Sequence, residues 1–216
     1  MNEWIPARHR IGFVTDKKYG KDSVEQRSDQ RSQGMSTVLE IYARVAADFG
    51  TRLKNCASNK WGEPSPCPGW TAWDVAAHVV RNHRRAVAGL TGVEFAAVDR
   101  SEDVMVAWHT ARDAVMTALA NSLTAHQMLG DEFGNMPFDQ FVRRMACSDT
   151  LIHTWDFARA TGQDEHLDTE AVHIALEFLI PEDRYIRIPG AYGNKIVPGP
   201  DADEQTWLLN FLGREV

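Results

Sequence analysis

The sequence predicts an all-α protein: an up-and-down four-helix bundle with a short fifth helix and an irregular C-terminal segment. Apolar residues recur at spacings of three and four over four long stretches, the period of an α-helix with one buried face. No run shows the apolar–polar alternation of a half-buried strand. Helices with one apolar stripe bury it against one another, so we expect function to lie inside a bundle.

The first two helices are predicted at residues 36–54 and 72–90. Ser36 can cap the first, and its apolar stripe then continues for five turns. The members of this stripe are Val38, Ile41, Tyr42, Val45, Phe49 and Leu53. Thr71 followed by Asp74 resembles a capping box, which predicts the start of the second helix.

The third and fourth helices are predicted at residues 101–123 and 137–162. Ser101 precedes two acidic residues, which favour the positive end of a helix dipole. Pro137 suits the first turn of the fourth helix, and Gly162 supplies a C-terminal stop.

Proline and glycine mark the irregular segments. The stretch KWGEPSPCPGW, residues 60–70, holds three prolines and two glycines, which predicts a rigid loop carrying two tryptophans. A fifth helix at residues 168–179 is ended by Pro181. The last 35 residues are predicted to form turns, with short strands as the alternative, before a final helical turn at residues 205–212.

Residues 1–34 differ in composition from residues 35–216, which we expect to form the bundle domain. The first segment has a net charge of +2 against −9 for the remainder, and few large apolar residues. Such a segment buries too little surface to order itself, so we expect disorder or loose packing. The alternative is docking of Trp4, Ile5 and Phe13 on the main body.

Composition excludes several classes of protein. A net charge of −7 and a pI near 5.6 disfavour binding to nucleic acid, which depends on basic patches. No stretch approaches the ~18 apolar residues of a membrane span, and no secretion signal is visible, so we expect a cytoplasmic protein without a membrane partner. Cys56, Cys67 and Cys147 form no CxxC pair and are expected to be reduced.

Three polar residues occur where the fourth helix should be apolar. At 100° per residue, Asp149, His153 and Asp156 fall in the middle of the face that this helix must bury. A buried unpaired carboxylate costs several kcal/mol, so these groups need a partner.

A divalent metal is one such partner. Asp149 and His153 lie one turn apart on the same side of the helix, and carboxylate and imidazole are ligands for zinc, iron or nickel. The alternative is a local hydrogen-bonded pair. A third ligand from the second helix would be His78 or His83, and the helical period slightly prefers His83.

Three ordered motifs carry a resemblance to a known family. They are WGEPSPCPGWTAWDVAAHVV, SDTLIHTWDFARATG and DADEQTWLLNFLGRE. Together they resemble the DinB-like metal-binding helical bundles, and within these the group related to the N-terminal domain of mycothiol-dependent maleylpyruvate isomerase. The resemblance covers about residues 36–216.

This resemblance implies a four-helix bundle that holds one divalent metal through His78, Asp149 and His153, which overrides the slight preference for His83. Zinc is the first expectation, with nickel or iron as alternatives. Mycothiol or bacillithiol would be the cosubstrate. The isomerase has Glu where Asp149 stands and a separate C-terminal domain, whereas only about fifty residues follow the fourth helix here. These departures argue against the isomerase activity itself and leave the substrate open.

Three protein ligands leave a coordination position for water, thiol or substrate. A metal-bound thiol is held as a thiolate. This suits a transferase that depends on a metal and a low-molecular-weight thiol and acts on a small molecule. Hydrolysis by a metal-bound hydroxide is also open. The alternative function is a noncatalytic metal-binding or small-ligand-binding bundle. The chain would act as a monomer or homodimer.

Other polar residues near this predicted site have two interpretations each. Asp156 either accepts from a ligand imidazole or pairs with Arg159 or Arg81. Arg85 either meets an anionic substrate or is solvated, and Cys67 is either a thiol at the site or a small buried apolar residue. The remaining histidines are expected to be ordinary: His109, His126, His166 and His173. Four tryptophans are expected to pack around the ends of the bundle: Trp61, Trp70, Trp73 and Trp155.

Overall fold

The structure is a computed structural model that describes residues 36–187 and 192–216. The prediction for residues 1–34 lies outside these ranges. Within them the secondary structure is helical, apart from two isolated β-bridges. The predicted all-α class is therefore confirmed. No helix in the described ranges has both the length and the apolar character needed to cross a membrane.

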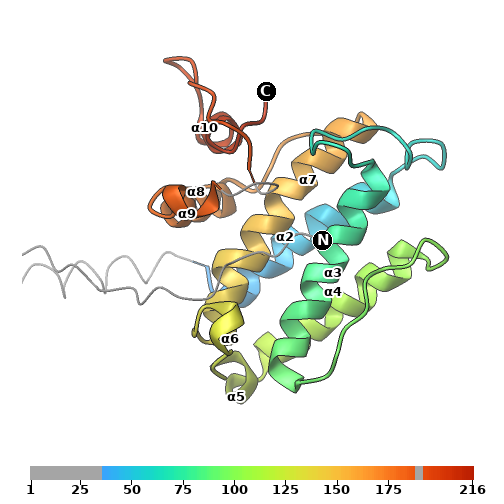
Figure 1. The fold of residues 1–216 in the computed structure, drawn as a ribbon, viewed down its shortest axis with the longest axis vertical. Coiled ribbons are helices and arrows are strands. Elements are labelled where there is room, and N and C mark those ends of the chain that lie inside the picture. Colours follow the sequence, from blue (N-terminus) through green and yellow to red (C-terminus); the bar gives the residue numbers. More distant parts are fainter. Residues whose placement is uncertain (1–35, 188–191) are drawn as a thin grey trace, which may run out of the picture.

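Four main helices form the bundle: α2 (Val38–Lys54), α3 (Ala72–Thr91), α4 (Val104–Ala120) and α7 (Cys147–Thr161). Both α2 and α3 pack against α4 and α7 (Figure 1). The consecutive helices α2 and α3 therefore occupy opposite corners, and the loop between them crosses one end of the bundle. This loop contains the proline-rich stretch and brings it close to α7.

The connection between α3 and α4 runs back along α3. Arg100, near its end, pairs with Asp74 in the first turn of α3 at 2.7 Å. Beyond α4, the Gln127 side chain donates to the Leu90 carbonyl at the end of α3. The two helices therefore run in the same direction, and residues 92–103 form a crossover between them (Figure 1). The predicted up-and-down order of the helices is therefore wrong at this connection, because no sequence pattern distinguishes a crossover from a loop at one end of the bundle.

Capping boxes start both α2 and α3. Thr71 and Asp74 form the predicted box at α3. At α2 the capping residue is Thr37, which exchanges hydrogen bonds with Glu40. Ser36 lies one residue outside the helix instead, and its backbone and hydroxyl donate to a glutamate of α8. The predicted N-cap was therefore one residue early.

The predicted third helix is longer than the observed one. Asp103 caps α4 by accepting from two backbone amides of the first turn, so Ser101 and Glu102 lie outside the helix. At the other end Asn121 leaves helical geometry and caps the short helix α5 (Ser122–Ala125). A 3-10 turn, η1 (Asp131–Phe133), follows it.

The predicted fourth helix is present but not uniform. It consists of α6 (Phe138–Phe141), a π-helical segment η2 (Val142–Ala146) and α7, and it ends at Gly162 in the left-handed conformation with φ of 72°. A π segment changes the angle between residues on either side of it. The site residues on α7 all follow it, so their predicted mutual positions are unaffected.

The C-terminal part lies against α7. Helix α8 (Thr169–Leu179) packs on α7, and α10 (Glu204–Phe211) packs on α8. A short helix, α9 (Asp183–Ile186), follows α8, and Figure 1 shows these three elements on the outer side of α7. The predictions at residues 168–179 and 205–212 are confirmed to within a residue. The chain end then returns toward α7, where Arg214 enters the bundle.

Candidate metal centre

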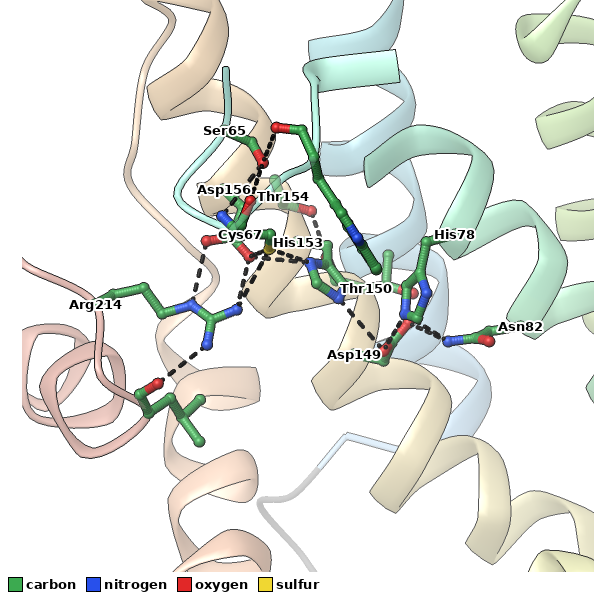
Figure 2. Close-up of polar contacts among 12 residues, drawn as sticks. Ser65, Cys67, His78, Asn82, Asp149, Thr150, His153, Thr154, Asp156 and Arg214 are labelled. Atoms are coloured by element: carbon green, nitrogen blue, oxygen red, sulfur yellow. Dashed lines mark hydrogen bonds and ion pairs between the residues drawn. The ribbon is translucent and has the colours of Figure 1, made fainter. Parts of the chain in front are cut away.

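Three candidate ligands converge at the interface of α3 and α7. His78 Nε2 lies 3.1 Å from Asp149 Oδ1, and His153 Nε2 lies 3.6 Å from the same oxygen. All three donor atoms are within 4.8 Å of one another, and both imidazoles are buried. The structure thus brings together the three side chains that the resemblance implied (Figure 2).

The donor set fits a first-row divalent ion. Donor atoms bonded to such an ion at about 2.1 Å lie about 3 to 3.5 Å from one another, close to the separations from Asp149 to the two histidines. Two neutral imidazoles and a carboxylate from one side of the site leave the opposite side for other ligands. The geometry of the three side chains is therefore compatible with an open metal site.

Opposing effects set the charge states of the acidic and basic groups. Burial alone would raise the pKa of Asp149, but the neighbouring imidazoles and Asn82 outweigh it and hold this pKa below its usual value. Burial would lower the pKa of His153, but Asp149 and Asp156 raise it to about 10. For His78 burial dominates and lowers the pKa. In this geometry the site thus has a carboxylate between one cationic and one neutral imidazole.

Asp156 fixes the orientation of the His153 ring. Its Oδ2 lies 2.9 Å from His153 Nδ1, so that ring nitrogen carries a proton and Nε2 is turned toward Asp149. Asp156 is fully buried and forms a two-pronged ion pair with Arg214, at 2.9 and 3.2 Å. Burial would raise the Asp156 pKa, but Arg214 and His153 outweigh it and hold it low. Asp156 is thus an acceptor for the imidazole and also an ion-pair partner, although the predicted partners Arg159 and Arg81 were wrong.

The proline-rich loop supplies the outer wall. Cys67 Sγ lies 3.3 Å from Asp156 Oδ2 and 3.9 Å from His153 Nδ1, so the thiol does reach the site (Figure 2). The Trp70 ring lies against both imidazoles, with centroid distances of 4.8 Å to His78 and 5.9 Å to His153. Trp70 therefore covers the site in addition to packing at the end of the bundle.

Cys67, His153 and Asp156 form a second group of potential ligands. This group shares His153 with the first but uses Nδ1 in place of Nε2. The Arg214 guanidinium is already bound to Asp156 at 2.9 Å, and a cation there opposes a metal ion. The first group, in which Asp156 supports a ligand histidine, is therefore the better metal centre.

One contact of His78 must change if a metal binds. Arg81 can only donate, and its guanidinium lies 3.2 Å from His78 Nδ1, so that nitrogen accepts a hydrogen bond. Coordination through Nε2 requires the proton on Nδ1, which removes this bond. Asn82 lies 2.9 Å from His78 Nε2 and donates to Asp149 Oδ2 at 3.0 Å. Metal binding therefore displaces Arg81 and rearranges the contact of Asn82 with Nε2.

His83 lies elsewhere in the core. It is completely buried, its Nδ1 lies 2.8 Å from the Val79 carbonyl, and its ring packs between Tyr42 and Trp108. The helical period thus predicted correctly that His83 is buried. The inference that it faces the site was wrong, because its side chain faces α2 and α4.

The other predicted residues have ordinary partners or line a cavity. Arg85 borders a cavity beside Asp149 and donates to the Glu132 carbonyl at 3.1 Å. Three exposed histidines contact acidic side chains: His126, His166 and His173. Three further tryptophans pack against rings or guanidinium groups: the partly buried Trp61 and Trp73, and the fully buried Trp155.

Sequence reasoning did not single out Arg214 or Asn82. Arg214 belongs to the last of the three family-like motifs, so the signal was present, but its distance from Asp156 along the chain hid the pairing. Asn82 lies four residues after His78, the spacing of side chains that meet on a helix.

Comparison with known proteins decides the family. The family model described as the mycothiol maleylpyruvate isomerase N-terminal domain matches residues 42–158, more than half of the chain. The chain belongs to this family. The match includes all three candidate ligands, whereas Arg214 lies beyond it. The part of the chain that matches the family model thus carries the three candidate ligands.

The relatives in the comparison are themselves without a described function. Two proteins of Mycobacterium tuberculosis, from strains CDC 1551 / Oshkosh and ATCC 25618 / H37Rv, are each 31% identical to the chain over 189 residues. The alignment covers 82% of the chain and 98% of the relatives, and both are named as uncharacterized. No solved structure matches the chain.

Proposed function

We propose that the protein holds one divalent metal, zinc in the first instance, through His78, Asp149 and His153, and that it is a thiol-dependent transferase. The observation that carries the proposal is the convergence of these three donor atoms within 4.8 Å, with a buried carboxylate fixing the ring of one ligand. Nickel and iron suit the same ligands.

A bound divalent ion would supply an acidic centre at which a low-molecular-weight thiol is held as a thiolate near neutral pH. Asp156 accepts a hydrogen bond from the protonated Nδ1 of His153 and so keeps Nε2 directed at the site. Arg214 keeps Asp156 charged, and Trp70 excludes water from one side. The family name points to mycothiol as the thiol, and bacillithiol has the same reactive group.

A cytoplasmic location is part of this proposal. The described cysteines are all free, which suits a reducing compartment, and low-molecular-weight thiols are kept reduced in such a compartment.

A noncatalytic bundle is the second candidate, and one observation favours it. Both Asp149 oxygens already have partners, since His78 contacts one and Asn82 donates to the other. Both carboxylate oxygens are thus satisfied without an ion, as a ligand-binding protein without a metal would require.

Elemental analysis of untagged protein tests the proposal. We expect close to one metal ion per chain in the wild type and its loss in His78→Ala, Asp149→Ala and His153→Ala. His126→Ala is the control, because that exposed histidine lies outside the site. A wild-type protein that neither contains nor takes up metal would leave the noncatalytic bundle as the function. With metal present, thiol-transfer assays using mycothiol and bacillithiol follow.

A further inference from the structure

A cavity borders Asp149 between α3, η2 and α8. Its polar lining includes three arginines, Arg81 and Arg85 from α3 and Arg144 from η2. Its apolar lining includes Phe141, Met145, Phe178 and Leu179. The cavity therefore combines a concentrated positive charge with apolar walls, next to one of the proposed metal ligands.

The three guanidinium groups form no ion pair with a carboxylate in the described part of the chain. Arg81 donates to His78, Arg85 donates to a backbone carbonyl, and Arg144 lies 6.0 Å from the centroid of the Phe178 ring. Burial lowers the pKa of Arg85. Like charges gathered at a partly desolvated site repel one another, and an anion relieves this repulsion.

Ser148 is an independent sign of a ligand. Its side chain lines the same cavity and is buried, yet its hydroxyl has no hydrogen-bond partner among the described residues. Buried hydroxyl groups are nearly always satisfied, so an unpartnered one at a cavity wall indicates a missing acceptor. The π segment η2, which carries Arg144 and Met145, is a rare element that is frequent at functional sites.

We propose that this cavity binds the oxyanion end, a carboxylate or a phosphate monoester, of a small substrate with an apolar body. Arg85 and Arg144 supply the planar, two-pronged contacts that oxyanions favour, and Ser148 donates a further hydrogen bond. The apolar body lies along the phenylalanine walls. This inference rests on the proposed function, because the metal beside Asp149 is taken as the reacting centre.

Calorimetric titration of the zinc-loaded full chain tests the inference. Benzoate and phenyl phosphate are the probes, and benzamide is the uncharged match to benzoate. We expect at least one of the two anions to bind, and benzamide to bind at least about tenfold more weakly than benzoate if benzoate binds. Tighter binding of benzoate identifies a carboxylate substrate, and tighter binding of phenyl phosphate identifies a phosphate ester.

Substitutions assign the binding to the arginines. Arg85→Gln and Arg144→Gln should each weaken anion binding by about tenfold or more, and Ser148→Ala by several-fold. Arg143→Gln is the matched control, since Arg143 lies in the same π segment but does not line the cavity. The proposal is overturned if neither anion binds, or if Arg85→Gln and Arg144→Gln bind the anions as tightly as Arg143→Gln does.

The same samples separate this inference from the proposed function. Metal content is measured in each, and the titration is repeated with His153→Ala. If the protein holds no metal but still binds the anion in a way that depends on the arginines, the anion site stands and the proposed metal site is wrong. Anion binding that is lost in His153→Ala but is insensitive to the arginine substitutions would place the anion on the metal and reject the anion site.

Discussion

The buried ion pair of Asp156 and Arg214 should be a major contributor to stability. The Asp156 side chain is fully buried and that of Arg214 is 9% exposed, with contacts of 2.9 and 3.2 Å between them. Breaking a buried pair by removing one partner costs about 3–5 kcal/mol. Without Arg214, only His153 would remain to compensate the buried Asp156 charge. Arg214→Met should therefore lower the free energy of unfolding by about 3 kcal/mol or more, even though the apolar part of the side chain is kept.

Urea unfolding of chelator-treated protein measures this effect without the contribution of a metal. The double variant Asp156→Asn/Arg214→Met should lose much less than the sum of the two single variants, with a coupling of about 2 kcal/mol or more. Arg112→Met is the control, because its partly exposed pair with Asp113 should contribute about 1 kcal/mol at most. A loss below about 1 kcal/mol in Arg214→Met, or no coupling, would refute the assigned role of this pair.

Three further predictions concern the fold around the site. The pKa of Asp168 is lowered, because burial would raise it but the contact with Arg44 outweighs burial. The charged Asp168 should therefore stabilise the fold above about pH 4, and this contribution should be lost as the pH falls below that value. In thermal melts, Asp168→Asn should be less stable than the wild type at pH 7 and match it near pH 2. Gly213 has φ of 82° and backbone atoms 2.8 Å from where a Cβ would lie, so Gly213→Ala should cost about 2 kcal/mol or more in urea unfolding and displace Arg214. Thr71→Ala removes the cap of α3 and should cost about 1 kcal/mol.

Each of these has a matched comparison. Asn is itself a good N-cap, so Asp168→Asn keeps the cap of α8 and isolates the charge. A constant deficit of Asp168→Asn from pH 2 to 7 would contradict the pH argument. Gly199→Ala is the control for Gly213→Ala, because nothing lies within 4 Å of its added Cβ. Thr71→Ser retains a capping hydroxyl, and a loss as large as that of Thr71→Ala would count against the cap.

Local sequence patterns predicted what depends on local interactions. The spacing of Thr71 and Asp74 gave the start of α3, and Gly162 gave the end of α7. The spacing of Asp149 and His153 placed them on one side of a helix, because that relation depends only on the helical period. These features need no knowledge of how the helices pack.

Features that depend on packing could not be predicted in this way. The helical period identified His83 as buried, but burial toward Tyr42 and Trp108 looks the same in sequence as burial toward α7. Arg214 and Asp156 are 58 residues apart, and only the return of the C-terminal segment brings them together. The π segment η2 has no sequence signature that separates it from an α-helix.

X-ray absorption spectroscopy of the metal-loaded protein identifies the atoms bound to the metal. We expect nitrogen and oxygen ligands only, with two imidazoles, and a sulfur neighbour at about 2.3 Å that arises on adding a low-molecular-weight thiol. A sulfur neighbour before thiol is added, lost in Cys67→Ser, would instead place the metal in the Cys67 group and contradict the proposed ligand set. A spectrum without imidazole scattering would contradict it equally.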